Sequence, residues 1–276
     1  MSKRDEVEEI EIDLLLDGIH RCYGYDFHLY SKKTIKRRVL QFKEERARDY
    51  ISDLMAPCLH DEDFFLDLLQ HFSIAVTKMF RDPPIFRALR EQVLPALARH
   101  GGIKVWSAGC ATGEEAYSIA ILLKEAGFLE HSMIYATDFN FEALSRAKKG
   151  IYQSERLRDF TKDYYECGGK EPFSSYFWVD EEFCRIDKEL RKAVTFASHN
   201  LSTDMVFGEM QLILCRNVLI YFCSELRDRV IDLFTKSLCE GGFLCLGKSE
   251  CLDSKYLGTE FEALDESTRI YRRICP

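Results

Sequence analysis

The stretch that most constrains the fold runs from Lys104 to Ala126. A short apolar run ends at Ser107, a turn of small residues around Gly109 follows, and a helical pattern begins at Glu114. Apolar residues then recur at spacings of three and four, as on one face of a helix. A strand, a glycine loop and a helix in this order open a nucleotide-binding α/β unit. Glycine suits such a loop because it lets the backbone approach a ligand where a Cβ would collide.

The charge of this loop favours one kind of ligand. Its glycines are spaced G-x-x-x-G rather than G-x-G-x-x-G, and Glu114 and Glu115 occupy the first helical turn. Those carboxylates would repel a phosphate at the helix N-terminus by about 1–4 kcal/mol at roughly 4 Å. A cofactor without phosphate and with a positive centre, such as S-adenosylmethionine, fits better. The alternative is that both glutamates only cap the helix and complement its dipole.

A second acidic residue supports an adenosine ligand. Residues 133–137 form a strand-like run that leads into Asp138, 29 residues beyond Gly109. An acid at the tip of the second strand is where ribose hydroxyls are held. Acids also end strands as caps of the next helix, so the combination with the glycine loop is what indicates adenosine.

Composition bounds the remaining possibilities. With 276 residues, 46% of them hydrophobic, the chain is long enough for one sizeable core and a smaller domain. A net charge of −8 argues against a nucleic-acid-binding surface.

Eleven cysteines without a C-x-x-C pair indicate reduced thiols in a cytoplasmic protein. The seven histidines show no metal-ligand spacing, so we predict no metal. No apolar run reaches the length of a transmembrane helix, and the N-terminus has no signal-peptide core.

The chain is predicted to divide into a helical domain over residues 1–76 and a second domain over residues 77–276, with residues 77–90 as the linker. Two prolines at Pro83 and Pro84 mark this linker because proline disfavours helix before it. The helical domain carries the dense positive patch of this acidic chain: Lys32, Lys33, Lys36, Arg37 and Arg38. The patch is either a solvated helix face or a docking surface for an acidic partner, with salt-sensitive binding.

Further elements are expected in the second domain. Residues 165–192 are rich in aromatic, strand-prone residues and predict a small antiparallel insertion that either carries recognition or covers the core. Strands are expected at 193–197 and 212–215, and a helix that ends at Glu240-Gly241-Gly242, followed by a strand over 243–246. Because the carboxyl ends of parallel strands share one edge, we expect these residues to gather near Asp138: Asn200, Arg216, Asn217 and Tyr221.

Five motifs occur together in the chain: SAGCATGEEAYSIA, ATDFN, SHNL, CRNVLIYF and GGFLCLGKSE. In this order and spacing they resemble the CheR family of S-adenosylmethionine-dependent methyltransferases, which esterify glutamate side chains of bacterial chemoreceptors, the methyl-accepting chemotaxis proteins. The resemblance covers nearly the whole chain. It implies a Rossmann-like class I methyltransferase sheet of α/β class, with an N-terminal all-helical domain and a small antiparallel β insertion. It also implies a cytoplasmic protein of chemotactic signal transduction, for which we expect a monomer.

The resemblance assigns roles to individual residues. It implies that Arg81 and Tyr221 are catalytic, with Arg81 orienting the incoming carboxylate and Tyr221 lying beside the reactive methyl. It implies the following cofactor contacts: Thr77, Arg81, Gly109, Glu115, Asp138, Asn200, Leu201, Arg216 and Asn217. The chain departs from the family pattern N-x-T-x-F-F-R at Ala75 and Met79, and has Lys248 where the family usually has histidine. From the residues alone, the alternatives are that Arg81 forms an interdomain salt bridge and that Tyr221 is ordinary core packing.

The chemistry explains why no catalytic triad or metal motif is expected. A glutamate side chain has a pKa near 4.3 and is already a nucleophile at neutral pH. The protein has chiefly to align oxygen, methyl carbon and sulfur and to exclude water. The expected partners are chemoreceptor cytoplasmic domains, bound through the basic helix and the inserted β-subdomain. The alternatives are a non-catalytic S-adenosylmethionine-binding scaffold and a methyltransferase of another signalling protein, a small molecule or nucleic acid. A nicotinamide dehydrogenase is disfavoured by the charge of the loop.

Overall fold

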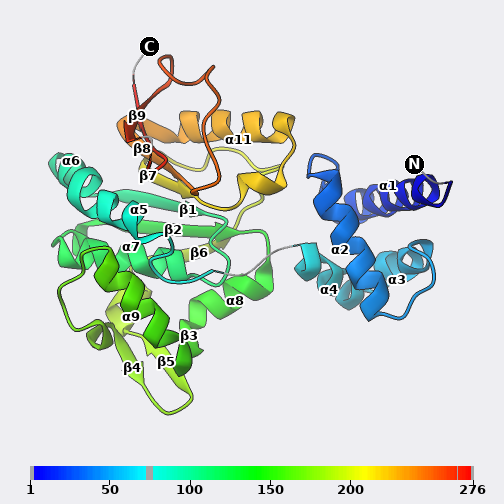
Figure 1. The fold of residues 1–276 in the computed structure, drawn as a ribbon, viewed down its shortest axis with the longest axis horizontal. Helices are drawn as coiled ribbons and strands as arrows, with labels where there is room; N and C mark the ends of the chain where they lie inside the picture. Colours follow the sequence, from blue (N-terminus) through cyan, green and yellow to red (C-terminus); the bar gives the residue numbers. More distant parts are fainter. Residues whose placement is uncertain (1–2, 73–76, 266, 275–276) are drawn as a thin grey trace. The chain divides into compact units, whose positions relative to one another are not determined.

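The computed structural model describes residues 3–72, 77–265 and 267–274, and the chain divides into two compact units (Figure 1). The first unit comprises the N-terminal helices together with residues 202–204 and 221–230. The second unit holds the remaining described residues and the main sheet. The predicted boundary after residue 76 borders residues 73–76, which lie outside the described residues, as does Ala75.

The first unit is built on helices with apolar inner faces. Their bounds are α1 (Lys3–Tyr23), α2 (Lys32–Glu45), α3 (Met55–His60) and α4 (Glu62–Phe72), with a 3-10 turn η1 (Ser52–Leu54). The buried residues recur at helical spacing, as Ile35, Val39 and Phe42 do on α2. The predicted helical character of this part of the chain is therefore confirmed.

The second unit contains a seven-stranded sheet in the order β6-β2-β1-β7-β8-β10-β9. The strands are β1 (Lys104–Ala108), β2 (Met133–Asp138), β6 (Val194–Ser198), β7 (Met210–Cys215), β8 (Leu238–Leu246), β9 (Phe261–Asp265) and β10 (Ile270–Arg273). The first five in spatial order pair in parallel, whereas β10 runs antiparallel to both neighbours. The order reverses between β1 and β7, and open α/β sheets bind their ligands at such a point.

Helices cover both faces of this sheet: Figure 1 shows α7 on one side and the end of α11 on the other, and residues 231–237 of α11 belong to this unit whereas residues 224–230 group with the first. The helices are α5 (Pro83–Ala88), α6 (Leu94–Leu97), α7 (Glu114–Glu125), α8 (Phe141–Lys149), α9 (Leu157–Glu166), α10 (Lys188–Lys192) and α11 (Ser224–Ser237). A π-helical turn η2 (Leu89–Val93) joins α5 to α6, and short 3-10 turns complete the set: η3 (Ala98–His100), η4 (Leu129–His131), η5 (Ser154–Arg156), η6 (Phe173–Tyr176) and η7 (Leu219–Tyr221). The face of α7 predicted from sequence spacing is fully buried: Ala116, Ile119, Ala120 and Leu123.

A second, three-stranded sheet has the order β3-β5-β4 and is antiparallel throughout. Its strands are β3 (Ile151–Gln153), β4 (Phe177–Val179) and β5 (Phe183–Ile186). The antiparallel sheet expected within residues 165–192 is present. It also includes β3 from before that stretch, and α9 lies between β3 and β4. A three-residue strand has too little periodicity to be recognised locally, and β3 is a strand because it pairs with β5.

The predicted helix end at Glu240-Gly241-Gly242 is wrong. Helix α11 ends at Ser237, and both glycines lie inside β8. The pairing of β8 with β7 is irregular there. Between Met210 and Leu212 of β7, a step of two residues in β7 corresponds to a step of five residues in β8. Gly241 has a φ of +72°, which this bulge requires and which glycine adopts without strain. Among the described residues we found no helix with the length and apolar character of a membrane span.

Candidate active site

Two loops meet where the strand order reverses, one after β1 and one after β7. Gly109 follows β1, and its N–H donates to the C=O of Thr137 over 2.8 Å. Its φ is +76°, and a Cβ at this position would lie 2.5 Å from Cγ2 of Val218, in the loop after β7. Glycine is therefore required at Gly109 both by its conformation and by the close approach of the neighbouring loop.

Asp138, at the end of β2, organises the glycine loop. One carboxylate oxygen accepts a hydrogen bond from the backbone N–H of Ala111, and the other accepts one from Asn140, each at 2.9 Å. Burial raises the pKa of Asp138, although these backbone hydrogen bonds oppose the shift. Asp138 therefore connects the loop after β1 with the start of α8, and it lies where the sequence predicts a ribose contact.

The two glutamates at the start of α7 have different partners. Glu115 accepts a hydrogen bond from the Ser107 hydroxyl at 2.8 Å and pairs with the Arg216 guanidinium at 3.2 Å. Glu114 is fully buried, and its partners are Arg156 at 2.8 Å and the Thr112 hydroxyl at 2.6 Å. The loop charge considered in the sequence analysis is thus partly neutralised within the protein.

Arg156 is a residue of this site that the sequence analysis missed. Besides Glu114, its guanidinium donates to the C=O of Thr77 over 2.5 Å. Burial raises the pKa of Glu114, while the hydrogen bond from Thr112 and the charge of Arg156 lower it. Arg156 lies 42 residues from Glu114 in the sequence, on η5, and nothing in its local sequence marks it.

Arg216 is the central buried cation of the site, with a side chain only 2% exposed. Its guanidinium pairs with Asp82 at 2.8 Å, donates to the C=O of Arg81 over 2.6 Å and reaches Glu115. The same group lies over the ring of Phe86, 5.3 Å from its centroid. Arg216 therefore fastens the segment around Arg81 to the end of β7 and to the start of α7.

Glu250 fixes the loop after β7. Its carboxylate accepts hydrogen bonds from four backbone N–H groups: Asn217 at 2.8 Å, Val218 at 2.9 Å, Ile220 at 3.3 Å and Gly247 at 2.7 Å. Asn217 has a φ of +62°, a backbone conformation that residues other than glycine rarely adopt, and the hydrogen bonds to Glu250 support it. The motif GGFLCLGKSE contains Glu250, but its spacing alone does not reveal this role.

Two more predicted contacts lie at the same edge of the sheet. Asn200 and Leu201 follow β6, whose Ser198 pairs with Asp138, and the N–H of His199 donates to the C=O of Asp138 over 3.2 Å. Leu201 is buried. The sheet therefore brings together the ends of β1, β2, β6 and β7, as the sequence predicts.

The remaining predicted residues are placed differently. Tyr221 groups with the first unit, where its C=O accepts a hydrogen bond from the N–H of Ser31 over 2.7 Å. Its place beside a reactive methyl stays a prediction. Met79, where the family usually has phenylalanine, is fully buried in the core of the second unit, and Lys248 is exposed.

Two buried polar atoms test whether the site fits a polar cofactor. Oδ1 of Asn217 and Nε of Arg216 are buried and have no hydrogen-bond partner among the described residues. Buried polar groups nearly always have partners, so these atoms indicate a polar ligand at this edge. The charges of the site agree with a cation, since four carboxylates lie at this edge with three arginines: Asp82, Glu114, Glu115 and Asp138 with Arg81, Arg156 and Arg216.

A mostly parallel sheet of this order, a glycine loop at its switch point and an acid at the tip of β2 define a Rossmann-like nucleotide-binding domain of the kind found in class I methyltransferases. The family described as "CheR methyltransferase, SAM binding domain" matches residues 75–268. The chain belongs to this family, and its cofactor is S-adenosylmethionine.

Curated relatives match over most of their length. The protein Cher3 of Pseudomonas putida is 47% identical over 96% of this chain and 97% of its own. The chemotaxis protein methyltransferase of Listeria monocytogenes is 32% identical over 84% of this chain and 86% of its own length. That of Borreliella burgdorferi is 31% identical over 88% of this chain and 88% of its own length.

Proposed function

We propose that the protein transfers a methyl group from S-adenosylmethionine to glutamate side chains of chemoreceptors, forming methyl esters in sensory adaptation. The family supports methyl transfer, and relatives in Listeria and Borreliella are named chemotaxis protein methyltransferases. The observation that carries the proposal is the attachment of Arg81 to the cofactor edge by Arg216. The backbone of Arg81 is thereby held by the same guanidinium that pairs with Glu115.

The mechanism requires positioning rather than proton transfer. S-adenosylmethionine supplies a methyl group on a positively charged sulfur. Glu115 and Asp138 provide carboxylates for the polar groups of the cofactor, and Arg81 orients the incoming carboxylate, for which a guanidinium has bidentate geometry. Tyr221 is the second positioning group. A glutamate is already ionised at neutral pH, so the protein needs no general base.

The proposed partner surface on α2 consists of Lys32, Lys33 and Arg37, which are exposed. Lys36 of the same patch pairs with Glu8 of α1 at 3.3 Å, so it also holds two helices together. Lys32 and Lys33 occupy the first turn of α2, where no acidic residue accompanies them. Cations at a helix N-terminus are unfavourable by about 0.3–1 kcal/mol, a cost that favours a binding role for this end of α2.

A second proposed partner surface lies on the small sheet. A hollow of about 540 Å³ is lined by Ile151, Trp178, Asp180, Phe183, Arg185, Ile186, Asp187, Lys188 and Arg191. Trp178 is 65% exposed although it is a large apolar residue. Exposed aromatic side chains beside cationic ones suit a receptor segment that carries aromatic and acidic residues.

The catalytic proposal is tested with methyl-labelled S-adenosylmethionine and chemoreceptor-containing membranes. We expect base-labile label that is released as methanol, and we expect Arg81→Ala to lose it while leaving the fold intact. Arg158→Ala removes an exposed arginine of α9 and should keep full transfer. Label that resists mild base would exclude a carboxyl ester. If the wild-type protein binds the cofactor but transfers no methyl group, a non-catalytic scaffold would be favoured instead.

The docking proposal is tested by reversing charge on α2. Replacing Lys32, Lys33 and Arg37 with glutamate should raise KM for receptor membranes at least tenfold, with a weaker salt dependence than in the wild type. The matched control replaces three exposed lysines of the second unit with glutamate: Lys148, Lys149 and Lys192. Equal effects of both changes would mean that only net charge matters.

A further inference from the structure

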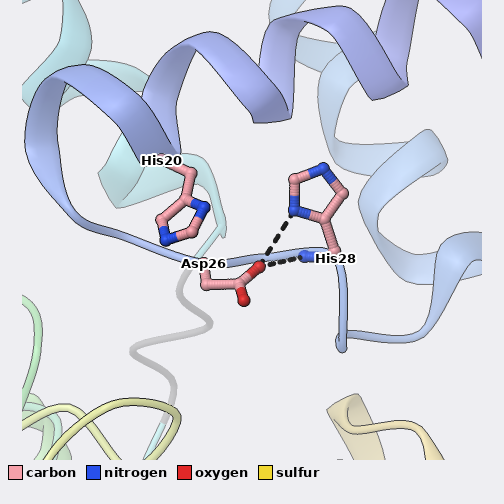
Figure 2. A group of neighbouring side chains, drawn as sticks. All are labelled: His20, Asp26 and His28. Carbon is pink, nitrogen blue, oxygen red and sulfur yellow. Dashed lines mark hydrogen bonds and ion pairs between the residues drawn. The ribbon is translucent and has the colours of Figure 1, made fainter.

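Three side chains that metals favour as ligands lie together at the end of α1: His20, Asp26 and His28 (Figure 2). One ligand atom of each lies within 4.8 Å of those of the other two. His20 belongs to the last turn of α1, and Gly24, with a φ of +78°, turns the chain back after the helix. Its N–H donates to the C=O of His20 over 2.9 Å. This glycine cap brings Asp26 and His28 against the helix end.

We propose that His20, Asp26 and His28 bind a divalent transition-metal ion of the Zn²⁺ class. Two imidazoles and a carboxylate are a ligand set that such ions take, with metal–ligand distances of about 2.0–2.2 Å. Those distances imply ligand atoms about 3.3 Å apart, so the side chains have to close by up to roughly 1.5 Å. His20 and His28 are exposed, which leaves their rings room to do so.

One pair of the cluster is already close. Nδ1 of His28 and Oδ1 of Asp26 are 2.9 Å apart, and the N–H of His28 donates to the same oxygen over 3.0 Å. Figure 2 shows this nitrogen facing Asp26 and His20. This pair therefore needs little movement to hold one ion.

A second carboxylate supports the other side of the His28 ring. Oδ1 of Asp17, one turn before His20 on α1, lies 3.5 Å from Nε2 of His28. When a metal occupies Nδ1, Nε2 carries the proton, and this N–H can donate a hydrogen bond to Asp17. Metal-binding histidines commonly donate their second N–H to a carboxylate, which orients the ring and strengthens the ligand. Asp17 is therefore a positioning residue of the proposed site.

The loop that carries the ligands also holds the segment around Tyr221. The C=O of Leu29 accepts a hydrogen bond from the N–H of Cys223 over 2.8 Å, and Ser31 donates to Tyr221. The ring of Tyr30 packs edge-on against Phe222, with centroids 4.9 Å apart. A metal that links this loop to α1 should therefore reduce local opening of the residue 221–223 segment.

The test is calorimetric titration of Zn²⁺ into the chelator-treated full chain. We expect one ion per chain, and at least tenfold weaker binding in His20→Ala, Asp26→Asn and His28→Ala. Asp17→Asn should weaken binding by about 10–100-fold through His28. His60→Ala removes an exposed histidine of α3 and serves as the matched control. Equal affinity in the wild type and the His20 and His28 variants would overturn the proposal.

Two further measurements keep the test decisive. Co²⁺ bound at this site should show ligand-field bands without thiolate-to-metal charge transfer, whereas a thiolate band would assign the metal to a cysteine such as the exposed Cys22. Hydrogen exchange of the Cys223 amide should slow on Zn²⁺ addition in the wild type and stay unchanged in His28→Ala. Unchanged exchange in both would remove the link from the metal to the Tyr221 segment.

Discussion

Asp138 shows how a single carboxylate can prepare a binding edge. It accepts backbone hydrogen bonds from Ala111 and Asn140, and burial holds its pKa above the usual range. The two roles weighed for it from the sequence, a helix cap and a ribose ligand, do not compete. The cap fixes the position of the oxygens that a ribose would approach.

The raised pKa of Asp138 predicts a pH dependence of cofactor binding. As the pH falls, a carboxyl with a raised pKa takes up its proton earlier than an ordinary aspartate, whose pKa is about 3.9. Affinity for S-adenosylmethionine should therefore be full above the raised pKa and fall as the pH drops through it. Calorimetry between neutral and mildly acid pH measures this, and Asp138→Asn should bind weakly without that dependence. A wild-type affinity that stays constant down to about pH 4 would contradict the prediction.

Glu250 carries a prediction of stability. In Glu250→Gln one oxygen becomes an amide nitrogen, which faces N–H donors such as those of Asn217 and Gly247 and cannot accept from them. We expect the free energy of unfolding to fall by about 1–3 kcal/mol, the usual cost of unpaired buried donors, with weaker cofactor binding. Urea unfolding measures the first effect. Glu240→Gln, at an exposed position of β8, is the control.

At the scale of elements, the segment before α5 is held from two sides. Arg156 of η5 reaches Thr77, and Arg216 after β7 reaches Arg81 and Asp82. The segment therefore has a defined position at the cofactor edge although its own sequence forms no regular helix or strand from Thr77 to Asp82.

The pair of Arg156 with Glu114 gives a prediction for these elements. Arg156→Met leaves the fully buried Glu114 without its cation and should lower the free energy of unfolding by roughly 1–3 kcal/mol, since a buried group then loses its partner. Adding Glu114→Gln should restore part of that loss, because the uncompensated charge disappears. The free energies of unfolding of the wild type, the two single variants and the double variant form a double-mutant cycle. Additive losses would show that the pair is not coupled.

At the scale of the whole molecule, the units do not follow the order of the chain. Residues 202–204 and 221–230 group with the N-terminal helices, although they lie among the strands of the main sheet in sequence. The segment that contains Tyr221 is thus supported by residues more than 180 positions earlier, through Leu29, Tyr30 and Ser31.

This arrangement predicts the result of a truncation. Removing residues 1–72 takes away the hydrogen-bond partners of Tyr221 and Cys223 and the ring that covers Phe222. We expect faster hydrogen exchange in residues 221–223 and at least tenfold lower methyl transfer, while cofactor binding at Asp138 persists. A truncated chain with wild-type transfer and exchange would show that the helical unit serves docking alone.

Local sequence was informative where a pattern repeats over many residues. Spacing along the chain predicted four features, because helices and strands have fixed periods: the buried face of α7, the α2 helix with its basic surface, the glycine loop and the acid after β2. The insertion was found through its aromatic content, but β3 was missed because three residues carry no period. The glycine pair in β8 was interpreted as a helix end, since a bulge and a cap require the same backbone conformation.

Local patterns in the chain were therefore sufficient to predict the class of fold, the family and the residues that stand at the strand ends. How those residues are held became visible in the folded chain, since the partners are 42 residues apart for Arg156 and Glu114 and 101 apart for Arg216 and Glu115. The same holds for His20, Asp26 and His28, whose proximity depends on the turn at Gly24. Periodicity acts between neighbours along the chain, whereas charge pairing and ligand geometry depend on distances that exist only after the chain has folded.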